Sequence, residues 1–270
     1  MPRLDQVLVS RGLARSRTHA AKLIADGKVS LDGLVLAKAS QQVAHDASLD
    51  VAAHAEDRYV SRAGHKLAGA LDAFPDVDVR GKRCLDAGAS TGGFTDVLLR
   101  RGAHQVVAVD VGHGQLVDSL RNHPQVEVHE GLNVRYMTPG DIGGTAAVTV
   151  ADLSFISLTL VIGPLADCTD DGGDLVLMVK PQFEVGRERL SKTGVVTSED
   201  ERRRAVARVA SAAVDAGLQL MGLAASPLPG QDGNVEYFLW IRRRIGAPLP
   251  KIEERDADVA ALTEHLWPNH

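Results

Sequence analysis

Apolar positions in the first 50 residues recur at helical spacing twice and then alternate as they do in strands. The helical segments are LDQVLVSRGL and SRTHAAKLIADG, in which Ser16 is a typical N-cap and Gly27 a typical C-cap. KVSLDGLVL then predicts a β-hairpin around an Asp32-Gly33 turn, and an alternation over residues 48–52 adds a further strand. Together these elements predict a small α+β domain.

Beyond this domain the pattern changes to a longer helix and then to a regular alternation of strands and helices. The polar stretch AHAEDRYV is typical of a short interdomain linker, and SRAGHKLAGALDAF forms an amphipathic helix that Pro75 ends. From Lys82 onward, apolar strands alternate with amphipathic helices, which predicts a mostly parallel sheet covered on both faces. We therefore expect a first domain at residues 1–56, a linker at 57–61, a second domain at 62–245 and a C-terminal tail at 246–270.

The last two predicted strands narrow the fold class further. LQLMGLAAS and NVEYFLWIRR are joined only by PLPGQDG, which is too short for a crossover helix, so these strands must pair antiparallel. A doubly wound seven-stranded α/β sheet with an antiparallel last strand resembles the class I, Rossmann-like methyltransferase fold. The fold of a plain dinucleotide-dependent dehydrogenase would not lead us to expect this terminal hairpin. The tail after Arg244 is polar, with a weak helix near its end, and the pattern assigns it no function.

Composition excludes several classes of protein. Hydrophobic residues at 44% and charged residues at 24% are ordinary globular values, which excludes wholesale disorder. Cys84 and Cys168 lie far apart without partnering histidines, so neither a disulfide framework nor a metal site is expected. The first residues lack the apolar core of a signal peptide, and the uncharged run at 153–166 is shorter than a membrane-spanning helix. We expect a cytoplasmic protein that does not contact membranes.

Basic charge is concentrated at the start of the chain. The net charge is −5, so affinity for nucleic acid must come from a local surface. A helix start with adjacent arginines favours phosphate, because its amides and its dipole attract anions. The order helix, helix, hairpin in ARSRTHAAKLIADGKVSLDG resembles the alpha-L RNA-binding domain, and this match favours RNA over an ordinary solvated helix face. The candidate RNA contacts are Arg3, Arg15, Arg17, Lys22 and Lys28.

The segment LDAGASTGGF has the composition of a cofactor loop between a first strand and a first helix. Its glycines allow close backbone approach to a ligand, but their spacing is not the G-x-G-x-x-G of dinucleotide enzymes. Asp110 ends the next strand, where a carboxylate binds the ribose hydroxyls of an adenosine cofactor. S-adenosylmethionine therefore fits better than a dinucleotide, although tight packing alone also requires glycines. The candidate cofactor residues are Asp86, Gly88, Ala89, Ser90, Thr91, Gly92, Gly93, Phe94, Asp110, Asn133 and Asp152.

The end of the fourth strand of the predicted sheet reads ADLSF and not Asn-Pro-Pro-Tyr. Methylation of an exocyclic amine therefore loses support, and methylation of cytosine C5 lacks a suitably placed cysteine. Four charged residues instead lie at or near the strand ends: Lys66 in the helix before the sheet, Asp152, Lys180, and Glu236 in the last strand. Structural ion pairing at the rim of the sheet is the alternative interpretation, but two lysines and two carboxylates facing one cleft favour catalysis.

A ribose hydroxyl is a weak acid, so its methylation requires a base close to the oxygen. Lysine serves when burial or a neighbouring cation lowers its pKa. Lys180 is the candidate base, and Lys66 either lowers the pKa of Lys180 or orients the ribose. Asp152 and Glu236 then position the two lysines.

Several strings together resemble the TlyA family over nearly the whole chain: RYVSRAGHKL, LDAGASTGGFTDVLL, VDVGHGQL, ADLSFISL, LVLMVKPQFEVG and PGQDGNVEYFLW. The resemblance implies ribosomal RNA 2′-O-methylation of cytidine in small-subunit and often large-subunit RNA, with a Lys-Asp-Lys-Glu tetrad at the four residues named above. It implies ribosomal subunits, not DNA, as partners. The family linker, Arg-Ala-Trp-Val in many members, is here Arg58-Tyr59-Val60-Ser61, which puts its role in coupling RNA docking to cofactor binding in doubt.

Two other functions compete with this interpretation. The family has also been called haemolysin, but the sequence offers no export signal, spanning segment or strongly basic amphipathic helix for a membrane-active protein. The other is a ribosome-binding assembly factor without catalysis, against which the intact tetrad argues. The sequence leaves open the modified nucleotide, the number of subunit substrates and the oligomeric state.

Overall fold

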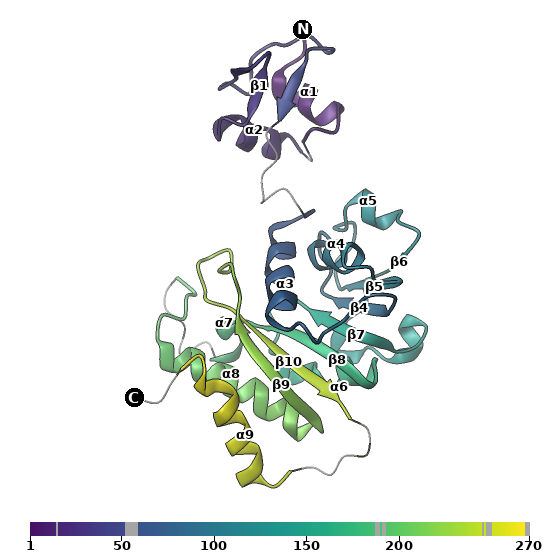
Figure 1. Cartoon of the computed structure of the whole chain (residues 1–270), viewed down its shortest axis with the longest axis vertical. Coiled ribbons are helices and arrows are strands. Elements are labelled where there is room, and N and C mark those ends of the chain that lie inside the picture. The colour runs from purple at the N-terminus through teal and green to yellow at the C-terminus, as the bar shows by residue number, and fades with distance from the viewer. Residues whose placement is uncertain are drawn as a thin grey trace. The chain divides into compact units, whose positions relative to one another are not determined.

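The computed structural model describes residues 1–14, 16–51, 59–186, 190, 193–244, 246 and 250–267, which belong to two compact units. The first unit is Met1–Arg58 and the second is Tyr59–His270. Figure 1 shows both units, and the fold of each is described separately below.

The first unit contains two helices and a three-stranded antiparallel sheet. The helices are α1 (Leu4–Ser10) and α2 (Arg17–Ala25), and the sheet has the order β2 (Leu34–Val35), β1 (Val29–Leu31), β3 (Leu49–Val51). Ser16 caps α2 as predicted, because its side chain accepts a hydrogen bond from the amide of His19 at 3.1 Å. The C-cap is Asp26, one residue earlier than expected, and Gly27 follows with a left-handed φ of +70°.

The β1–β2 turn and the core of this unit follow the sequence pattern. Asp32 and Gly33 both have positive φ, at 50° and 82°, as a tight two-residue hairpin turn requires. The buried core is formed by apolar side chains from both helices, the sheet and the connecting loops: Leu4, Val7, Leu8, Ala14, Ala20, Leu23, Ile24, Val29, Leu36, Val43 and Leu49.

The second unit is built on a seven-stranded sheet, which confirms the predicted fold class. The strand order is β6-β5-β4-β7-β8-β10-β9, and β10 runs antiparallel to both of its neighbours. The strands are β4 (Arg83–Ala87), β5 (Gln105–Asp110), β6 (Val126–Glu130), β7 (Ala146–Ala151), β8 (Thr169–Val179), β9 (Leu218–Ala225) and β10 (Tyr237–Arg243). The β4, β5, β6, β7 and β8 pairings are all parallel, as βαβ connections require.

Helices bury both faces of this sheet, so each central strand reads as a continuous apolar run. They are α3 (Arg62–Ala73), α4 (Gly93–Arg100), α5 (Asp118–Arg121), α6 (Ile162–Asp167), α7 (Pro181–Glu184), α8 (Glu199–Asp215) and α9 (Ile252–Glu264). Three short 3₁₀ turns add η2 (Val134–Tyr136), η3 (Pro139–Ile142) and η4 (Leu158–Leu160).

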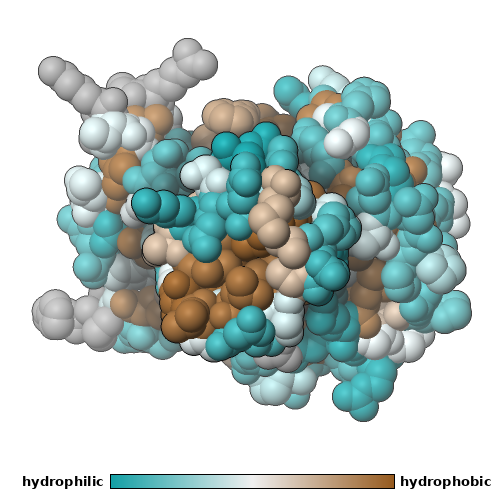
Figure 2. All heavy atoms as spheres, turned by 90° about the horizontal axis from the view of Figure 1, so that it is seen from above, coloured by the Kyte–Doolittle hydropathy of each residue, from teal (hydrophilic) through white to brown (hydrophobic). Residues whose placement is uncertain are grey.

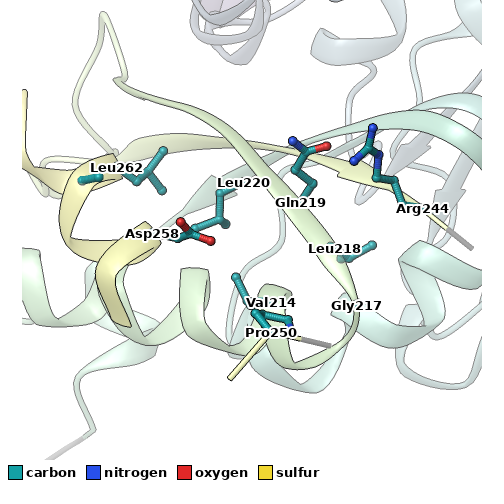
Figure 3. Close-up of a pocket in the computed structure, with 10 residues that line it drawn as sticks. Val214, Gly217, Leu218, Gln219, Leu220, Arg244, Pro250, Asp258 and Leu262 are labelled. Atoms are coloured by element: carbon teal, nitrogen blue, oxygen red, sulfur yellow. The ribbon is translucent and has the colours of Figure 1, made fainter. Parts of the chain in front are cut away.

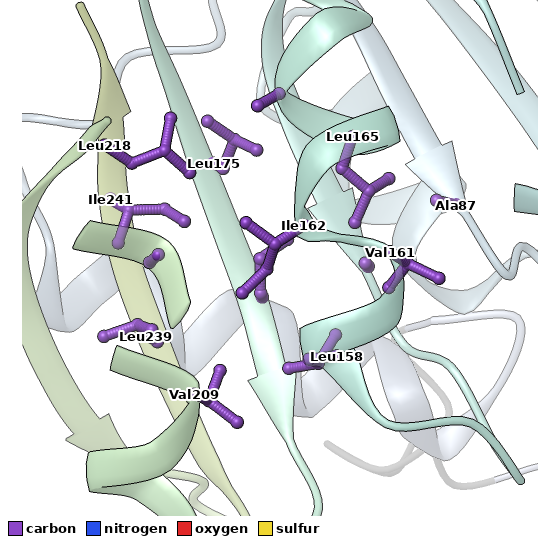
Figure 4. Close-up of a cluster of buried hydrophobic side chains, with 14 of the residues drawn as sticks. Ala87, Leu158, Val161, Ile162, Leu165, Leu175, Val209, Leu218, Leu239 and Ile241 are labelled. Atoms are coloured by element: carbon purple, nitrogen blue, oxygen red, sulfur yellow. The ribbon is translucent and has the colours of Figure 1, made fainter. Parts of the chain in front are cut away.

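Alternate residues of the same strands enter two separate cores. In β8, Val176 and Met178 pack with side chains of α3 and α4, whereas Leu175 and Leu177 pack with those of α6 and α8. Figure 4 shows part of the second core, with Ile162 and Leu165 of α6 near Leu175 of β8 and Ile241 of β10. The two cores fix the sheet rigidly, so the loops at its strand ends have a stable base.

The described part of the C-terminal tail belongs to this fold. Helix α9 lies beside α8 and β9 (Figure 1), and Val259 and Trp267 are buried in the core that α6 and α8 share. The Trp267 ring lies 5.0 Å from that of Tyr237 between centroids. Between β9, α8 and α9 the chain leaves a cavity of 460 Å³, lined in part by Leu220 and Asp258 (Figure 3).

Part of the expected linker is also packed. Residues 52–58 lie outside the described residues, but Tyr59 is buried against the second unit and its ring contacts that of His65. The amide of Val60 donates to Asp96 Oδ2 of α4 at 2.9 Å. The chain therefore enters the second unit in a fixed conformation from Tyr59 onward.

Figure 2 shows one face of the protein, on which most residues are hydrophilic and an apolar patch lies near the centre. Within the described ranges, no helix combines the length and the apolar character that crossing a membrane requires.

Candidate functional site

The glycine-rich loop lies where β4 ends and α4 begins, as the sequence predicts. Three of its residues have positive φ: Gly88 at 86°, Ser90 at 47° and Gly92 at 98°. A Cβ at Gly88 would lie 2.7 Å from the backbone oxygen of Asp152, so only glycine fits between the ends of β4 and β7. Asp110 at the end of β5 fixes the loop, because its Oδ2 accepts a hydrogen bond from the Ser90 amide at 2.8 Å.

Two cavities adjoin this loop and contain most of the predicted cofactor residues. A cavity of 480 Å³ is lined by Gly88, Ser90, Asp110, Asn133 and Asp152, among others. A smaller cavity of 150 Å³ is lined by Gly88, Ala89, Ser90, Thr91, Gly93, Phe94 and Asp152, together with Ser61 and Lys180. Asp86 and Gly92 line neither cavity: Asp86 is fully buried in β4, and a Cβ on Gly92 would clash with Leu116 and Leu120.

Acidic side chains dominate the electrostatics of this region. Burial, together with the nearby charges of Asp152 and Asp110, raises the pKa of Asp86 to about 7. Thr95 Oγ1 donates to Asp86 Oδ2 at 2.6 Å, whereas Asp86 Oδ1 has no hydrogen-bond partner among the described residues. The two carboxylates that line the larger loop cavity, Asp110 and Asp152, favour a ligand that carries positive charge and hydroxyl donors. S-adenosylmethionine, with its sulfonium, ammonium and ribose hydroxyl groups, has that chemistry.

The four tetrad residues form two ion pairs. Lys66 Nζ of α3 lies 2.5 Å from Glu236 Oε2, and Lys180 Nζ lies 2.6 Å from Asp152 Oδ1. Each lysine thus pairs with a carboxylate. Asp152 directly follows β7 and Lys180 directly follows β8, but Glu236 precedes β10 and is not within the strand as expected.

A third cavity joins these pairs. It measures 750 Å³ and is lined by Lys66, Lys180 and Glu236, whereas Asp152 lines the two loop cavities. Ser154 lines all three cavities and accepts a hydrogen bond from Lys180 Nζ at 3.0 Å. The lysine pairs therefore lie where the cofactor cavities meet a larger space that is open to a substrate.

Sequence reasoning missed two aromatic residues at this site. Phe155 follows Ser154 and is 91% exposed, with a left-handed φ of +65° that is unusual for a bulky side chain. The centroid of its ring lies 5.3 Å from that of the Phe183 ring. Lys180 Nζ lies over the Phe183 ring, 5.9 Å from its centroid. The sequence signal for Phe155 is an aromatic residue inside the polar ADLSF motif, whose local pattern does not indicate that the ring is exposed beside Phe183.

Most of the basic candidates of the first unit form ion pairs on its surface. Arg3 and Arg17 both contact Asp5, at 3.0 Å and 3.1 Å. The guanidinium of Arg3, followed by that of Arg17, lowers the pKa of Asp5 to about 2. Lys22 and Lys28 both contact Asp26, at 3.4 Å and 3.2 Å. Arg15 lies outside the described residues.

The sequence matches two known families over these two units. Residues 59–243 match the FtsJ-like methyltransferase family, and residues 2–47 match the S4 domain. The fold and the cofactor loop thus define a methyltransferase class, and the first unit is of a recognised RNA-binding type, as expected from helix, helix and hairpin.

Three relatives extend the match to the whole chain. The "16S/23S rRNA (cytidine-2'-O)-methyltransferase TlyA" of Mycobacterium tuberculosis is 52% identical over 262 residues, which are 97% of each chain. "Hemolysin A" of Brachyspira hyodysenteriae is 36% identical, over 87% of this chain and 98% of its own. A solved structure of a candidate hemolysin from Streptococcus thermophilus is 36% identical, covers 98% of this chain and 96% of its own, and has a TM-score of 0.71. The chain belongs to the TlyA family of FtsJ-like methyltransferases.

Proposed function

We propose that this protein transfers the methyl group of S-adenosylmethionine to the ribose 2′-hydroxyl of a cytidine in ribosomal RNA. The observation that carries the proposal is the pair of lysine–carboxylate contacts, Lys180 with Asp152 and Lys66 with Glu236, beside the glycine-rich loop. The 52% identity to an rRNA (cytidine-2'-O)-methyltransferase over 97% of the chain supports the choice of nucleotide and of hydroxyl.

The cofactor cavity supplies acceptors for a cationic adenosine ligand. Asp110 binds the ribose hydroxyls, Asn133 contacts the adenine, and the loop residues 88–94 surround the rest of the molecule. S-adenosylmethionine, when bound, provides an electrophilic methyl group. Burial and the neighbouring acids raise the pKa of Asp86, so the region gains most from a positively charged occupant.

The tetrad residues act on the RNA ribose. Asp152 and Ser154 hold the amine of Lys180 in one position, and in its neutral form this amine accepts the proton of the 2′-hydroxyl. S-adenosylmethionine held by the glycine-rich loop and Asp110 would supply the methyl group to this deprotonated oxygen. Lys66, held by Glu236 in the lining of the same cavity, orients the ribose.

The remaining features support an RNA substrate that is docked at two places. The S4 domain binds folded RNA through phosphate contacts from its basic residues, including Arg3 and Arg17. The exposed ring of Phe155 at the mouth of the substrate cavity suits an unstacked base. Because this substrate belongs to ribosomal subunits, we expect the protein to act in the cytoplasm.

The first test is transfer of labelled methyl groups to isolated small subunits, large subunits and bare ribosomal RNA, followed by nuclease digestion and nucleoside analysis. We expect 2′-O-methylcytidine, and its distribution among the three samples identifies the substrate. A labelled base, or another labelled nucleoside, contradicts the proposed chemistry. If no label is transferred while the cofactor still binds, a non-catalytic assembly role replaces this proposal.

A further inference from the structure

Two loops at neighbouring strand ends meet in the wall of the substrate cavity. The first, residues 154–158, leads from Asp152 at the end of β7 into η4 and is called here the Phe155 loop. The second loop contains the short helix α7, which begins directly after Lys180. Both loops line the 750 Å³ cavity, through Ser154, Phe155 and Phe183 among others.

Glu184, the last residue of α7, joins these loops. It is buried, with 3% of its surface exposed, and both carboxylate oxygens are bonded to the Phe155 loop. Oε2 accepts a hydrogen bond from Ser157 Oγ at 2.6 Å, and Oε1 accepts one from the amide of Leu158 at 2.8 Å. The backbone oxygen of Glu184 accepts a further bond from Arg208 of α8 at 3.0 Å, which anchors α7 to the helical layer.

The Phe155 loop needs such an anchor because its central residue is strained. A left-handed φ is unfavourable for a residue with a side chain and persists only where the surroundings impose it. Phe155 is 91% exposed, so core packing does not impose its conformation. The flanking residues do: Ser154 is bonded to Lys180 on one side, and Ser157 and Leu158 are bonded to Glu184 on the other.

We infer that Glu184 is a positioning residue for the RNA nucleotide, because its two hydrogen bonds hold Phe155 and the end of β7 in register with Lys180. It acts through the loop and touches neither the RNA nor the cofactor. This inference rests on the proposed function for its kinetic consequences, but its structural consequence, a Phe155 loop that opens without Glu184, is independent of it.

A second buried acid provides a matched control. Asp174 is 5% exposed and, like Glu184, accepts two hydrogen bonds, from Trp240 Nε1 and Arg242 Nε, both at 2.9 Å. It lies in the middle of β8, whereas Lys180 follows the end of that strand, so the five extended residues 175–179 separate them. Asp174 also forms an ion pair with Arg242 at 2.8 Å. Glu184→Ala and Asp174→Ala therefore each remove two hydrogen bonds to a buried carboxylate, and only those of Glu184 involve the Phe155 loop.

The experiment compares Glu184→Ala, Glu184→Gln and Asp174→Ala with the unmodified chain. Hydrogen exchange of amides 154–158 is measured by mass spectrometry, with S-adenosylmethionine affinity by calorimetry and steady-state methyl transfer to ribosomal subunits. In Glu184→Ala we expect at least about tenfold faster exchange of this loop. We also expect a fall in kcat/KM for RNA of about tenfold to a hundredfold, with cofactor affinity changed less than about threefold.

Glu184→Gln should restore both readouts to within about threefold. Its amide oxygen still accepts from the Leu158 amide, and its amide nitrogen can donate to Ser157 Oγ. If Glu184→Ala proves too unstable to purify, Ser157→Ala removes one of the two bonds and should give an intermediate increase in exchange.

Three outcomes would overturn the inference: loop exchange in Glu184→Ala equal to that in Asp174→Ala, equal kinetic losses in those two variants, or no rescue by Glu184→Gln. Failure of the proposed function gives a different result. The unmodified chain then methylates no RNA, while the exchange experiment still decides whether Glu184 holds the Phe155 loop.

Discussion

The two units use ion pairs of the same chemistry in opposite environments. In the S4 domain, the side chains of Arg3 and Arg17 are 44% and 60% exposed, although the side chain of their shared partner Asp5 is only 5% exposed. In the methyltransferase domain, Lys66 and Lys180 are each 10% exposed, and their partners Glu236 and Asp152 are 3% and 17% exposed. Salt screens the exposed charges but reaches the buried ones far less.

This difference in the exposure of the ion pairs suits one unit to RNA binding and the other to catalysis. An exposed pair contributes about 0–1 kcal/mol to stability and can exchange its carboxylate for an RNA phosphate. Loss of one partner from a buried pair costs about 3–5 kcal/mol, so such a pair holds a fixed geometry. The first arrangement suits a surface that must release its target, and the second suits a site that must orient one amine toward one oxygen.

The largest expected effect concerns the buried pair at Lys180. Lys180→Ala should lower methyl transfer by about 10²–10⁴-fold, because the base is lost, while RNA affinity stays within about threefold. Single-turnover methylation and RNA binding measured on the same preparation check this. Lys180→Arg keeps the positive charge but does not accept a proton, so it should be equally inactive. A substantially active arginine variant would show that charge, not proton transfer, is the contribution of Lys180.

The second prediction concerns the buried acid of the cofactor region. The pKa of Asp86, about 7 in the folded protein, lies above its ordinary value of 3.8, so the folded state retains a proton that the unfolded chain releases. The free energy of unfolding should therefore fall as pH rises from about 4 to about 7, by at most about 4 kcal/mol.

Denaturant unfolding at pH 5 and pH 8 measures this effect. Both tryptophans of the chain, Trp240 and Trp267, lie in the second unit, so their fluorescence reports its unfolding. Asp86→Asn should flatten the pH dependence, since an amide does not titrate. Equal pH dependence in the variant and the unmodified chain would contradict the raised pKa.

The smallest expected effect concerns the exposed pairs. Arg3→Gln combined with Arg17→Gln should weaken RNA binding by about tenfold at 0.15 M salt. It should also reduce the slope of log affinity against log salt by about 1 for each lost phosphate contact. Titrations at several salt concentrations give this slope. Arg204→Gln, which removes an exposed arginine of α8, is the control and should leave the slope unchanged. An unchanged slope in the double variant would remove Arg3 and Arg17 from the RNA interface.

Patterns that depend on local spacing predicted most of the fold. The Ser16 cap, the Asp32-Gly33 hairpin and the antiparallel final strand each follow from short-range rules, and the structure contains all three. The packing of α9 and Trp267 was not predictable, because the weak periodicity of the tail gives no indication of the groove that receives it.

The candidate site was predictable in its residue types but not in its supporting contacts. Strand ends identified Asp152 and Lys180, because carboxyl ends of parallel strands meet at one edge of a sheet. Nothing in the sequence around Glu184 indicates that its carboxylate reaches residues 157 and 158, since that contact depends on how two loops fold over each other. The left-handed conformation of Phe155 was equally hidden, because sequence rules associate positive φ with glycine or asparagine.

The burial of Trp267 in the main core also has a consequence for synthesis of the chain. The S4 domain has all its core residues once residue 51 has been translated, whereas the methyltransferase core is incomplete until residue 267 is added. At 5–20 residues per second, these two moments are roughly 10–40 s apart. The core of the first unit is therefore complete in sequence well before that of the second unit, so the first unit can begin to fold while the second is still being synthesised.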